Sequence, residues 1–181
     1  MKNILILGKP GSGKGTQGKL LAEELGYDLV DAGHILRTEQ KKNTPLGKEI
    51  GLIIDDGNLL PDDMINEIIS NHIGNKHNCG FIFDGYPRTN NQADKLAELM
   101  DVDYVFFLEV DEDILVERIL KRGESSGRED DQHEDIILQR LENYHNLTKP
   151  VKDYYKDQLT VIDGNKPISE IHEDIINSLF A

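Results

Sequence analysis

Residues 4–16 have the sequence ILILGKPGSGKGT, in which four aliphatic residues precede a glycine-rich run with a central lysine. The aliphatic run is typical of a buried strand, and glycines let successive backbone N–H groups turn inward around an anion. A helix that begins near Lys14 would add the positive end of its dipole, and the lysine would reach the outer phosphates of a nucleotide. The stretch therefore predicts a strand, a phosphate-binding loop and a helix, as in nucleotide-handling proteins.

The spacing of this loop fits the phosphate-loop pattern, because four residues separate Gly8 from Gly13 and Lys14 follows. The pattern usually continues with a serine or threonine whose hydroxyl helps to hold magnesium, but Gly15 occupies that position. The hydroxyl is therefore missing or displaced to Thr16.

Residues 13–18 also match the glycine spacing of a dinucleotide-binding fingerprint. In that fold the first glycine follows the strand at once, whereas five residues separate Leu7 from Gly13 here. We therefore favour the phosphate loop over the dinucleotide fingerprint and over an ordinary flexible turn.

The length and composition bound the class of protein. The 181 residues suit a single α/β domain, residues 1–181, with a sizeable core. The formal net charge of −14 argues against binding a DNA or RNA backbone, because that affinity comes from Lys and Arg displacing counterions. Cys79 is the only cysteine, and no stretch approaches a membrane span. We expect a cytoplasmic protein with no structural zinc, no nucleic-acid partner and no membrane association.

Short apolar runs alternate with segments of helical periodicity along the chain. This alternation predicts an α/β fold with a parallel five-stranded sheet flanked by helices. The strand-like runs are residues 4–7, 29–30, 81–83, 104–110 and 159–162.

Two segments do not fit the simple alternation of strands and helices. Residues 33–61 contain two short helical patterns with no strand between them, which predicts a helical insert. Residues 123–133 are polar and interrupted by glycine, which predicts a short lid loop. Both segments could close over a ligand.

Arginine is scarce in this chain, which uses lysine as its general cation. A few arginines among many lysines are candidates for sites that need a planar, permanently charged fork to bind phosphate oxygens. Surface ion pairs would explain the same count, so the count alone leaves both interpretations open. The six arginines are Arg37, Arg88, Arg118, Arg122, Arg128 and Arg140.

With these residues in view, the chain resembles the nucleoside monophosphate kinases, most closely the short-lid adenylate kinases. The similarity runs essentially end to end, and its pieces occur in the order of that family. They are the loop of residues 8–16, Gly33-x-x-Leu36-Arg37, the run FDGYPRTNNQ of residues 83–92, Gly127-Arg128-x-Asp130-Asp131 with Arg140, and Gly164-Asn165-Lys166-Pro167.

The resemblance implies a P-loop kinase fold with a helical monophosphate-binding insert and a short lid. It also implies the reversible transfer of the γ-phosphoryl group of ATP to AMP, giving two ADP, in a protein that family precedent makes monomeric. Such a transfer needs no dedicated base, because an acceptor phosphate is already mostly ionised at neutral pH. Positioning and charge neutralisation carry the reaction.

The resemblance further assigns roles to single residues. The ATP site would comprise Gly11, Ser12, Gly13, Lys14, Gly15, Thr16, Arg118, Arg122 and Lys166. The AMP site would comprise Ala32, Arg37, Gly85, Arg88, Gln92, Arg128 and Arg140. Catalysis would depend on Lys14, Arg88, Arg122, Arg128 and Arg140. Asp84 would hold the Mg²⁺ that accompanies ATP, through water, unless it only caps the following turn.

The acceptor base is less well determined than the donor. Gln92 stands where an amide recognises adenine in adenylate kinases, and Thr89 is also of that type. Ala32 replaces their usual threonine and is more similar to UMP/CMP kinases, while His34 replaces an acidic residue. We expect AMP as acceptor, with a UMP/CMP kinase that uses ATP as the alternative.

Two other classes use a phosphate loop. A GTPase-type switch would need an Asn-Lys-x-Asp guanine motif, which the chain does not have. A nucleotide sensor that has lost phosphoryl transfer stays open at this point, although the full set of cationic positions weakens it.

Overall fold

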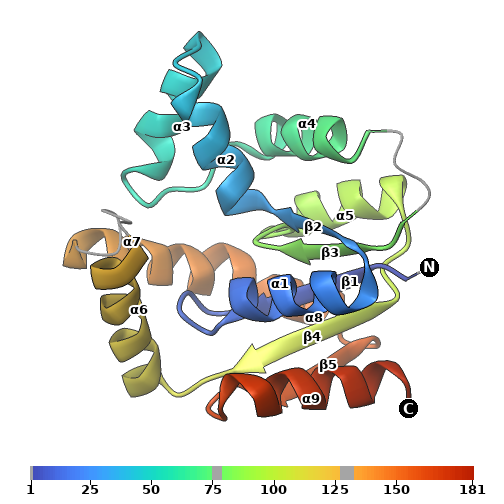
Figure 1. The fold of residues 1–181 in the computed structure, drawn as a ribbon. Coiled ribbons are helices and arrows are strands. Elements are labelled where there is room, and N and C mark those ends of the chain that lie inside the picture. The colour runs from blue at the N-terminus through green and yellow to red at the C-terminus, as the bar shows by residue number, and fades with distance from the viewer. Residues whose placement is uncertain (1, 75–78, 127–132) are drawn as a thin grey trace.

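Five parallel strands form a single sheet in the spatial order β2-β3-β1-β4-β5 (Figure 1). The computed structural model describes residues 2–74, 79–126 and 133–181. The arrangement confirms the parallel five-stranded α/β sheet predicted from the alternating apolar runs. The strands are β1 (Ile4–Gly8), β2 (Asp28–Asp31), β3 (Phe81–Asp84), β4 (Tyr104–Glu109) and β5 (Leu159–Asp163).

Helices connect the strands and cover both faces of the sheet (Figure 1). Within the described ranges, none of them is both long and apolar enough to cross a bilayer. The helices are α1 (Lys14–Leu25), α2 (Ala32–Lys41), α3 (Pro45–Ile54), α4 (Asp62–Ile73), α5 (Asn90–Leu99), α6 (Glu112–Ser126), α7 (Glu134–Asn143), the π-helical η2 (Tyr144–Thr148), α8 (Lys149–Tyr154) and α9 (Ile168–Leu179).

The side chains of β1 alternate between two layers of the core, because successive residues of a strand point to opposite faces of the sheet. Ile4 and Ile6 pack on the side of α1 and α9. Leu5 and Leu7 pack on the side of α4, α5 and α8. A strand covered on both faces needs an unbroken apolar run, which residues 4–7 supply.

The carboxyl ends of all five strands lie at one edge of the sheet, because the strands are parallel. The chain leaves β1 toward β2 on one side and later crosses to β4 on the other side. Open α/β sheets bind ligands outside the carboxyl ends of the strands at such a switch point. The glycine-rich loop follows β1 there, and Asp31 and Asp84 are register partners at the ends of β2 and β3.

Helices α2 and α3 form a pair that stands off this edge (Figure 1), and apart from Ala32, the first residue of α2, they fall in the predicted insert of residues 33–61. Thr44 caps α3, since its hydroxyl accepts a hydrogen bond from the backbone N–H of Gly47 at 3.0 Å. The two helices approach closely, because a Cβ on Gly47 would lie only 2.5 Å from the carbonyl oxygen of Glu39. The close packing of α2 against α3 therefore requires a glycine at position 47.

The predicted lid loop, residues 123–133, differs in its first part. Helix α6 continues to Ser126, so residues 123–126 are helical. A glycine inside a helix costs only about 1 kcal/mol relative to alanine, and good helix formers flank Gly123 on both sides. Residues 127–132, which include Arg128, Asp130 and Asp131, lie outside the described residues.

We expect Gly47→Ala to destabilise the protein by about 1–3 kcal/mol, because the added methyl group meets backbone that cannot move aside. Gly51 of the same helix is the matched control, since a Cβ there would lie 2.8 Å from Nε2 of the flexible Gln40 side chain. Urea unfolding of the parent and both variants measures the difference. An equal or larger loss for Gly51→Ala would contradict a close backbone contact at Gly47.

Candidate active site

The glycine-rich loop turns sharply between β1 and α1. Gly13 has a φ of 96°, a left-handed conformation that favours glycine, and is the N-cap residue of α1. Its carbonyl oxygen accepts the backbone N–H of Gln17 at 3.0 Å, which begins the helix. The six loop residues predicted to bind ATP all line one cavity: Gly11, Ser12, Gly13, Lys14, Gly15 and Thr16.

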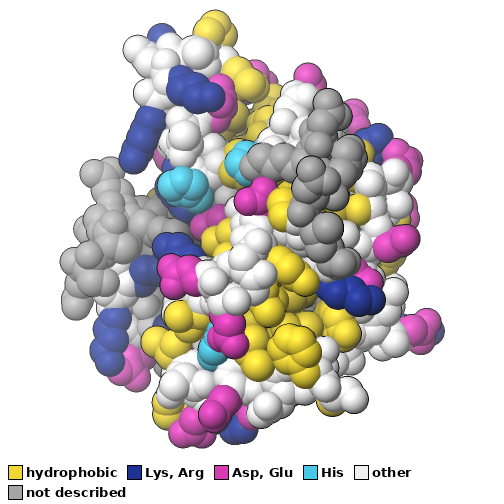
Figure 2. Space-filling model, turned by 45° about the vertical axis from the view of Figure 1, so that its right-hand side comes forward, with side chains coloured by type: hydrophobic (Ala, Val, Ile, Leu, Met, Phe, Trp, Pro, Cys, Tyr) yellow, Lys and Arg dark blue, Asp and Glu magenta, His cyan; other side chains and the backbone are white. Residues whose placement is uncertain are grey.

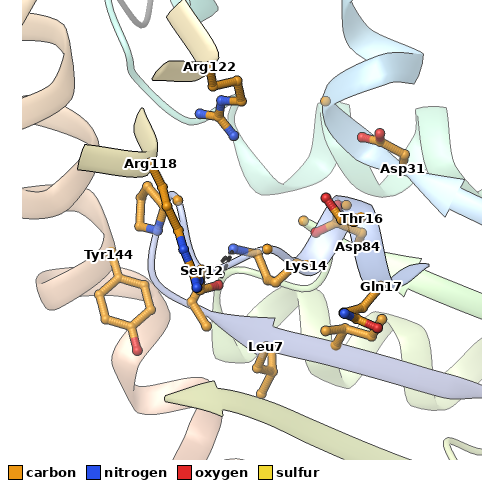
Figure 3. Close-up of a pocket in the computed structure, with 18 of the residues that line it drawn as sticks. Leu7, Ser12, Lys14, Thr16, Gln17, Asp31, Asp84, Arg118, Arg122 and Tyr144 are labelled. Atoms are coloured by element: carbon orange, nitrogen blue, oxygen red, sulfur yellow. Dashed lines mark hydrogen bonds between the residues drawn. The ribbon is translucent and has the colours of Figure 1, made fainter. Parts of the chain in front are cut away.

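The ammonium group of Lys14 holds its own loop together. Its Nζ donates to the carbonyl oxygens of Gly8 and Lys9, both at 2.9 Å, and lies 3.4 Å from Oγ of Ser12 (Figure 3). The pKa of Lys14 is lowered to about 8, mainly by burial and also by Arg88 and Arg122, against the opposing charge of Asp84. The lysine is thus a buried cation near other cations. Binding of a polyanion would offset the unfavourable electrostatic free energy of this arrangement.

The cavity beside this loop has a volume of about 790 Å³ and is lined by many cationic side chains. Arg118 and Arg122 lie one helical turn apart on α6, and Figure 3 shows Arg118 reaching toward Ser12. Every arginine in the described part of the chain lines this cavity: Arg37, Arg88, Arg118, Arg122 and Arg140. The shared location favours phosphate binding over scattered surface ion pairs.

This cluster is a local exception to the charge of the whole protein. Acidic side chains are spread over the face of the molecule shown in Figure 2, in keeping with the net charge of −14. Inside the cavity, by contrast, burial lowers the pKa of Arg88, and the neighbouring Arg140 and Arg37 lower it further despite Asp84 and Asp31. Gathering several guanidinium groups in one cavity costs electrostatic free energy. Binding of an anion would offset that cost.

A smaller cavity of about 80 Å³ adjoins the first one. Arg37, Arg88 and Arg140 line both cavities, so these cations lie where the two meet. The smaller cavity is otherwise bounded mainly by apolar residues of the insert and of α4, together with Ala32 and Gln92. Gln92 is a buried polar residue, with 2% of its surface exposed. A flat ring with polar edges suits this cavity, with an attached phosphate at the arginines.

Two carboxylates lie among the cations. Asp84 and Asp31 end adjacent strands and both line the larger cavity. Oδ2 of Asp84 lies close to the loop, since a Cβ on Gly15 would be 3.2 Å from it. Within the described ranges, no three His, Cys, Asp or Glu side chains are grouped to hold a metal by themselves. Mg²⁺ commonly uses one or two carboxylates plus waters and substrate phosphates, so this donor set fits it.

Among the predicted site residues that the structure describes, Lys166 lies apart from the others. Lys166 lines neither cavity, and its Nζ pairs with Oδ2 of Asp174 at 2.7 Å. Gly85, which the resemblance places in the AMP site, lines both cavities. Sequence reasoning missed Asp31, although it directly follows an apolar strand-like run, as Asp84 does.

Comparisons with known proteins identify the family. The sequence model of the family described as adenylate kinase matches residues 6–160. The chain belongs to the adenylate kinase family. Its similarity to adenylate kinases is spread over nearly the full length of both partners, so it is not confined to the phosphate loop. That extent separates the chain from the GTPase-type and dinucleotide-binding alternatives.

Three bacterial relatives named adenylate kinase illustrate this extent. The protein of Phocaeicola vulgatus is 43% identical over 97% of this chain and 97% of its own length. The protein of Bacteroides thetaiotaomicron is 43% identical over 99% and 98%, respectively. The protein of a Synechococcus strain is 38% identical over 97% and 94%.

We expect the protein to take up nearly one proton from solution when it binds ATP with magnesium at pH 9. Lys14 is mostly neutral above its pKa of about 8 in the free protein, and the bound polyphosphate restores the ammonium charge. Calorimetric titration in two buffers of different ionisation enthalpy measures this uptake. The Lys14→Met variant lacks the titrating group and should show no such uptake; equal uptake by both proteins would assign the proton to another residue.

Proposed function

We propose that this member of the adenylate kinase family reversibly transfers the γ-phosphoryl group of ATP to AMP through the cations of the larger cavity. The family membership gives the reaction, and one observation supports the residue roles. Lys14 and all the arginines of the described ranges converge on a cavity at the carboxyl edge of the sheet. A phosphoryl group in transfer spreads negative charge over its equatorial oxygens, and cations placed around it stabilise that charge.

The donor nucleotide occupies the larger cavity at the loop. Backbone N–H groups at the start of α1 and the ammonium of Lys14 bind its phosphates, so Lys14 exchanges loop carbonyls for phosphate oxygens. Arg118 lies against the adenine ring, and Arg122 reaches the phosphates from the same helix. Lys166 borders the adenine after release from Asp174.

The acceptor monophosphate occupies the smaller cavity. Arg37 and Arg88 bind its phosphate where the two cavities meet, which directs that phosphate toward the donor. Nε of Arg88 donates to the carbonyl oxygen of Gly85 at 2.9 Å, and this contact orients the guanidinium. The amide of Gln92 recognises the base, and Ala32 packs beside it.

Arg88, Arg122, Arg140 and Lys14 neutralise the charge on the group being transferred, joined by Arg128 from the lid. Asp84 would hold the Mg²⁺ that accompanies ATP through water, and the ion would supply positive charge beside the phosphates. Arginine suits these positions because its planar fork pairs with two phosphate oxygens at once, whereas lysine contributes a single point charge. Closure of the insert and lid would exclude water and limit hydrolysis of ATP.

AMP is the acceptor that the relatives support, and the UMP/CMP kinase alternative is not favoured. The alanine at position 32 removes one hydrogen bond with a net value of about 0.5–1.5 kcal/mol, too little to change the base by itself. We further propose that the protein works as a cytoplasmic monomer, since its ligands are small nucleotides and both cavities are formed by one chain.

An acceptor panel tests the function. With ATP and magnesium, we expect AMP to give ADP with a higher kcat/KM than UMP, CMP or GMP gives its diphosphate, because Gln92 presents an amide to the base. A coupled assay of each product measures the four values. Equal or better turnover of UMP or CMP would favour the pyrimidine alternative, and an inert protein that still binds ATP would favour a sensor.

The clamp on the acceptor phosphate can be tested by Arg88→Lys. We expect kcat/KM for AMP to fall by about 10²–10³-fold, because lysine cannot reproduce the two-point contact. The melting temperature should change little, since positive charge is kept at the site. Steady-state kinetics and thermal unfolding on the same preparation separate the two effects, and retained activity would exclude the proposed clamp.

A further inference from the structure

The side-chain amide of Gln92 is held at both ends by the protein. Its Nε2 donates to Oδ1 of Asp62 at 2.7 Å, and its Oε1 accepts the backbone N–H of Arg88 at 2.7 Å. The first contact reaches α4, and the second reaches the segment before α5. The amide of Gln92 therefore has a fixed position in the wall of the smaller cavity.

These two partners also fix which end of the amide is oxygen and which is nitrogen. An ionised carboxylate only accepts hydrogen bonds, and a backbone N–H only donates them. Rotation of the amide by a half turn would place Oε1 against the carboxylate of Asp62 and Nε2 against the N–H of Arg88. Both contacts would become repulsive, so the polarity of Gln92 is locked in one sense.

Asp62 is itself held firmly. It begins α4, where the helix dipole favours a negative charge. The hydroxyl of Thr89 donates to its two carboxylate oxygens, at 3.0 and 3.1 Å, and accepts the backbone N–H of Gln92 at 3.1 Å. Thr89 is the N-cap residue of α5, so the carboxylate is positioned by the beginnings of two helices.

The other half of the amide remains for a ligand. An amide has two N–H donors and two acceptor lone pairs, and Asp62 and Arg88 use one of each. Gln92 lines the smaller cavity, whereas Asp62 does not. The lock thus offers one donor and one acceptor of fixed order to a base in that cavity.

This order discriminates between purines of the same size. Adenine presents an amino donor at C6 next to the ring acceptor N1, which pairs with a carbonyl oxygen and an N–H in one order only. Hypoxanthine and guanine present an oxo acceptor at C6 and a ring N–H, the reverse order. A free amide could turn to suit either edge, but the locked one suits only the order that its partners impose.

We infer that Asp62 is a positioning residue for base specificity, which acts by fixing the polarity of Gln92 for a 6-aminopurine monophosphate. The inference rests on the proposed placement of the acceptor base beside Gln92. The carboxylate does not touch the substrate, so its effect appears in the choice between substrates and not in the phosphoryl transfer itself.

The test compares AMP with inosine monophosphate (IMP), whose base is the same size but has the reverse hydrogen-bonding edge. Asp62→Asn keeps the shape of the side chain but can donate as well as accept, so Gln92 can turn. We expect the ratio of kcat/KM for IMP to that for AMP to rise about tenfold, in line with loss of one charge-assisted hydrogen bond. Asp63→Asn is the matched control, because Asp63 is an exposed acid in the same helical turn, and its ratio should equal that of the parent.

A second pair of variants separates positioning from general stability. In a Gln92→Leu background, Asp62→Asn should no longer change the ratio, because the group that it orients is gone. The ratio is read on the folded fraction alone, and Asp62→Ser, which also suits the first turn of a helix, replaces Asp62→Asn if that variant does not fold.

Two results would overturn the inference. An unchanged ratio in Asp62→Asn, with a parent that prefers AMP, would show that the carboxylate is only structural. An equal change of the ratio in the Gln92→Leu background would show that it acts without Gln92. A parent that does not convert AMP would instead refute the proposed function, so the two failures are distinguishable.

Discussion

The burial of several cations in one cavity is the constraint on which the rest of this structure depends. Lys14 and Arg88 both have lowered pKa values because burial and neighbouring positive groups oppose their charges. Such an arrangement persists only where a rigid frame supports it, and the parallel sheet with its two covered faces supplies that frame. Asp31 and Asp84 moderate the repulsion from the ends of adjacent strands.

The frame follows from simple features of the chain. A fully apolar β1 requires helices on both sides, and parallel strands bring their carboxyl ends to one edge. The phosphate loop and the insert both begin at that edge. Asp31 and Asp84 end their strands there. The arginines then reach the same space from α2, α6, α7 and the segment after β3, so arginines as far as 103 positions apart, Arg37 and Arg140, contribute to one cavity.

Much of this could be predicted from the sequence, because the loop of residues 8–16 and the apolar runs are local signals that tertiary contacts do not override. The gathering of the arginines was predicted only through resemblance to a family, since single residues far apart carry no periodic pattern. Asp62 is an acid in the first turn of a helix, a common position that by itself indicates no role in the site. Its contact with Gln92, 30 positions away, is visible only in three dimensions. The continuation of α6 through Gly123 was missed because a glycine inside a helix has the same local signature as a loop.

Arg88 joins two parts of the site that are usually considered separately. Its backbone N–H holds the amide of Gln92, and its guanidinium lies where both cavities meet. A base that displaces the amide therefore also disturbs the peptide that carries the guanidinium. In the proposed site, this one peptide unit therefore links recognition of the base to the placement of the acceptor phosphate.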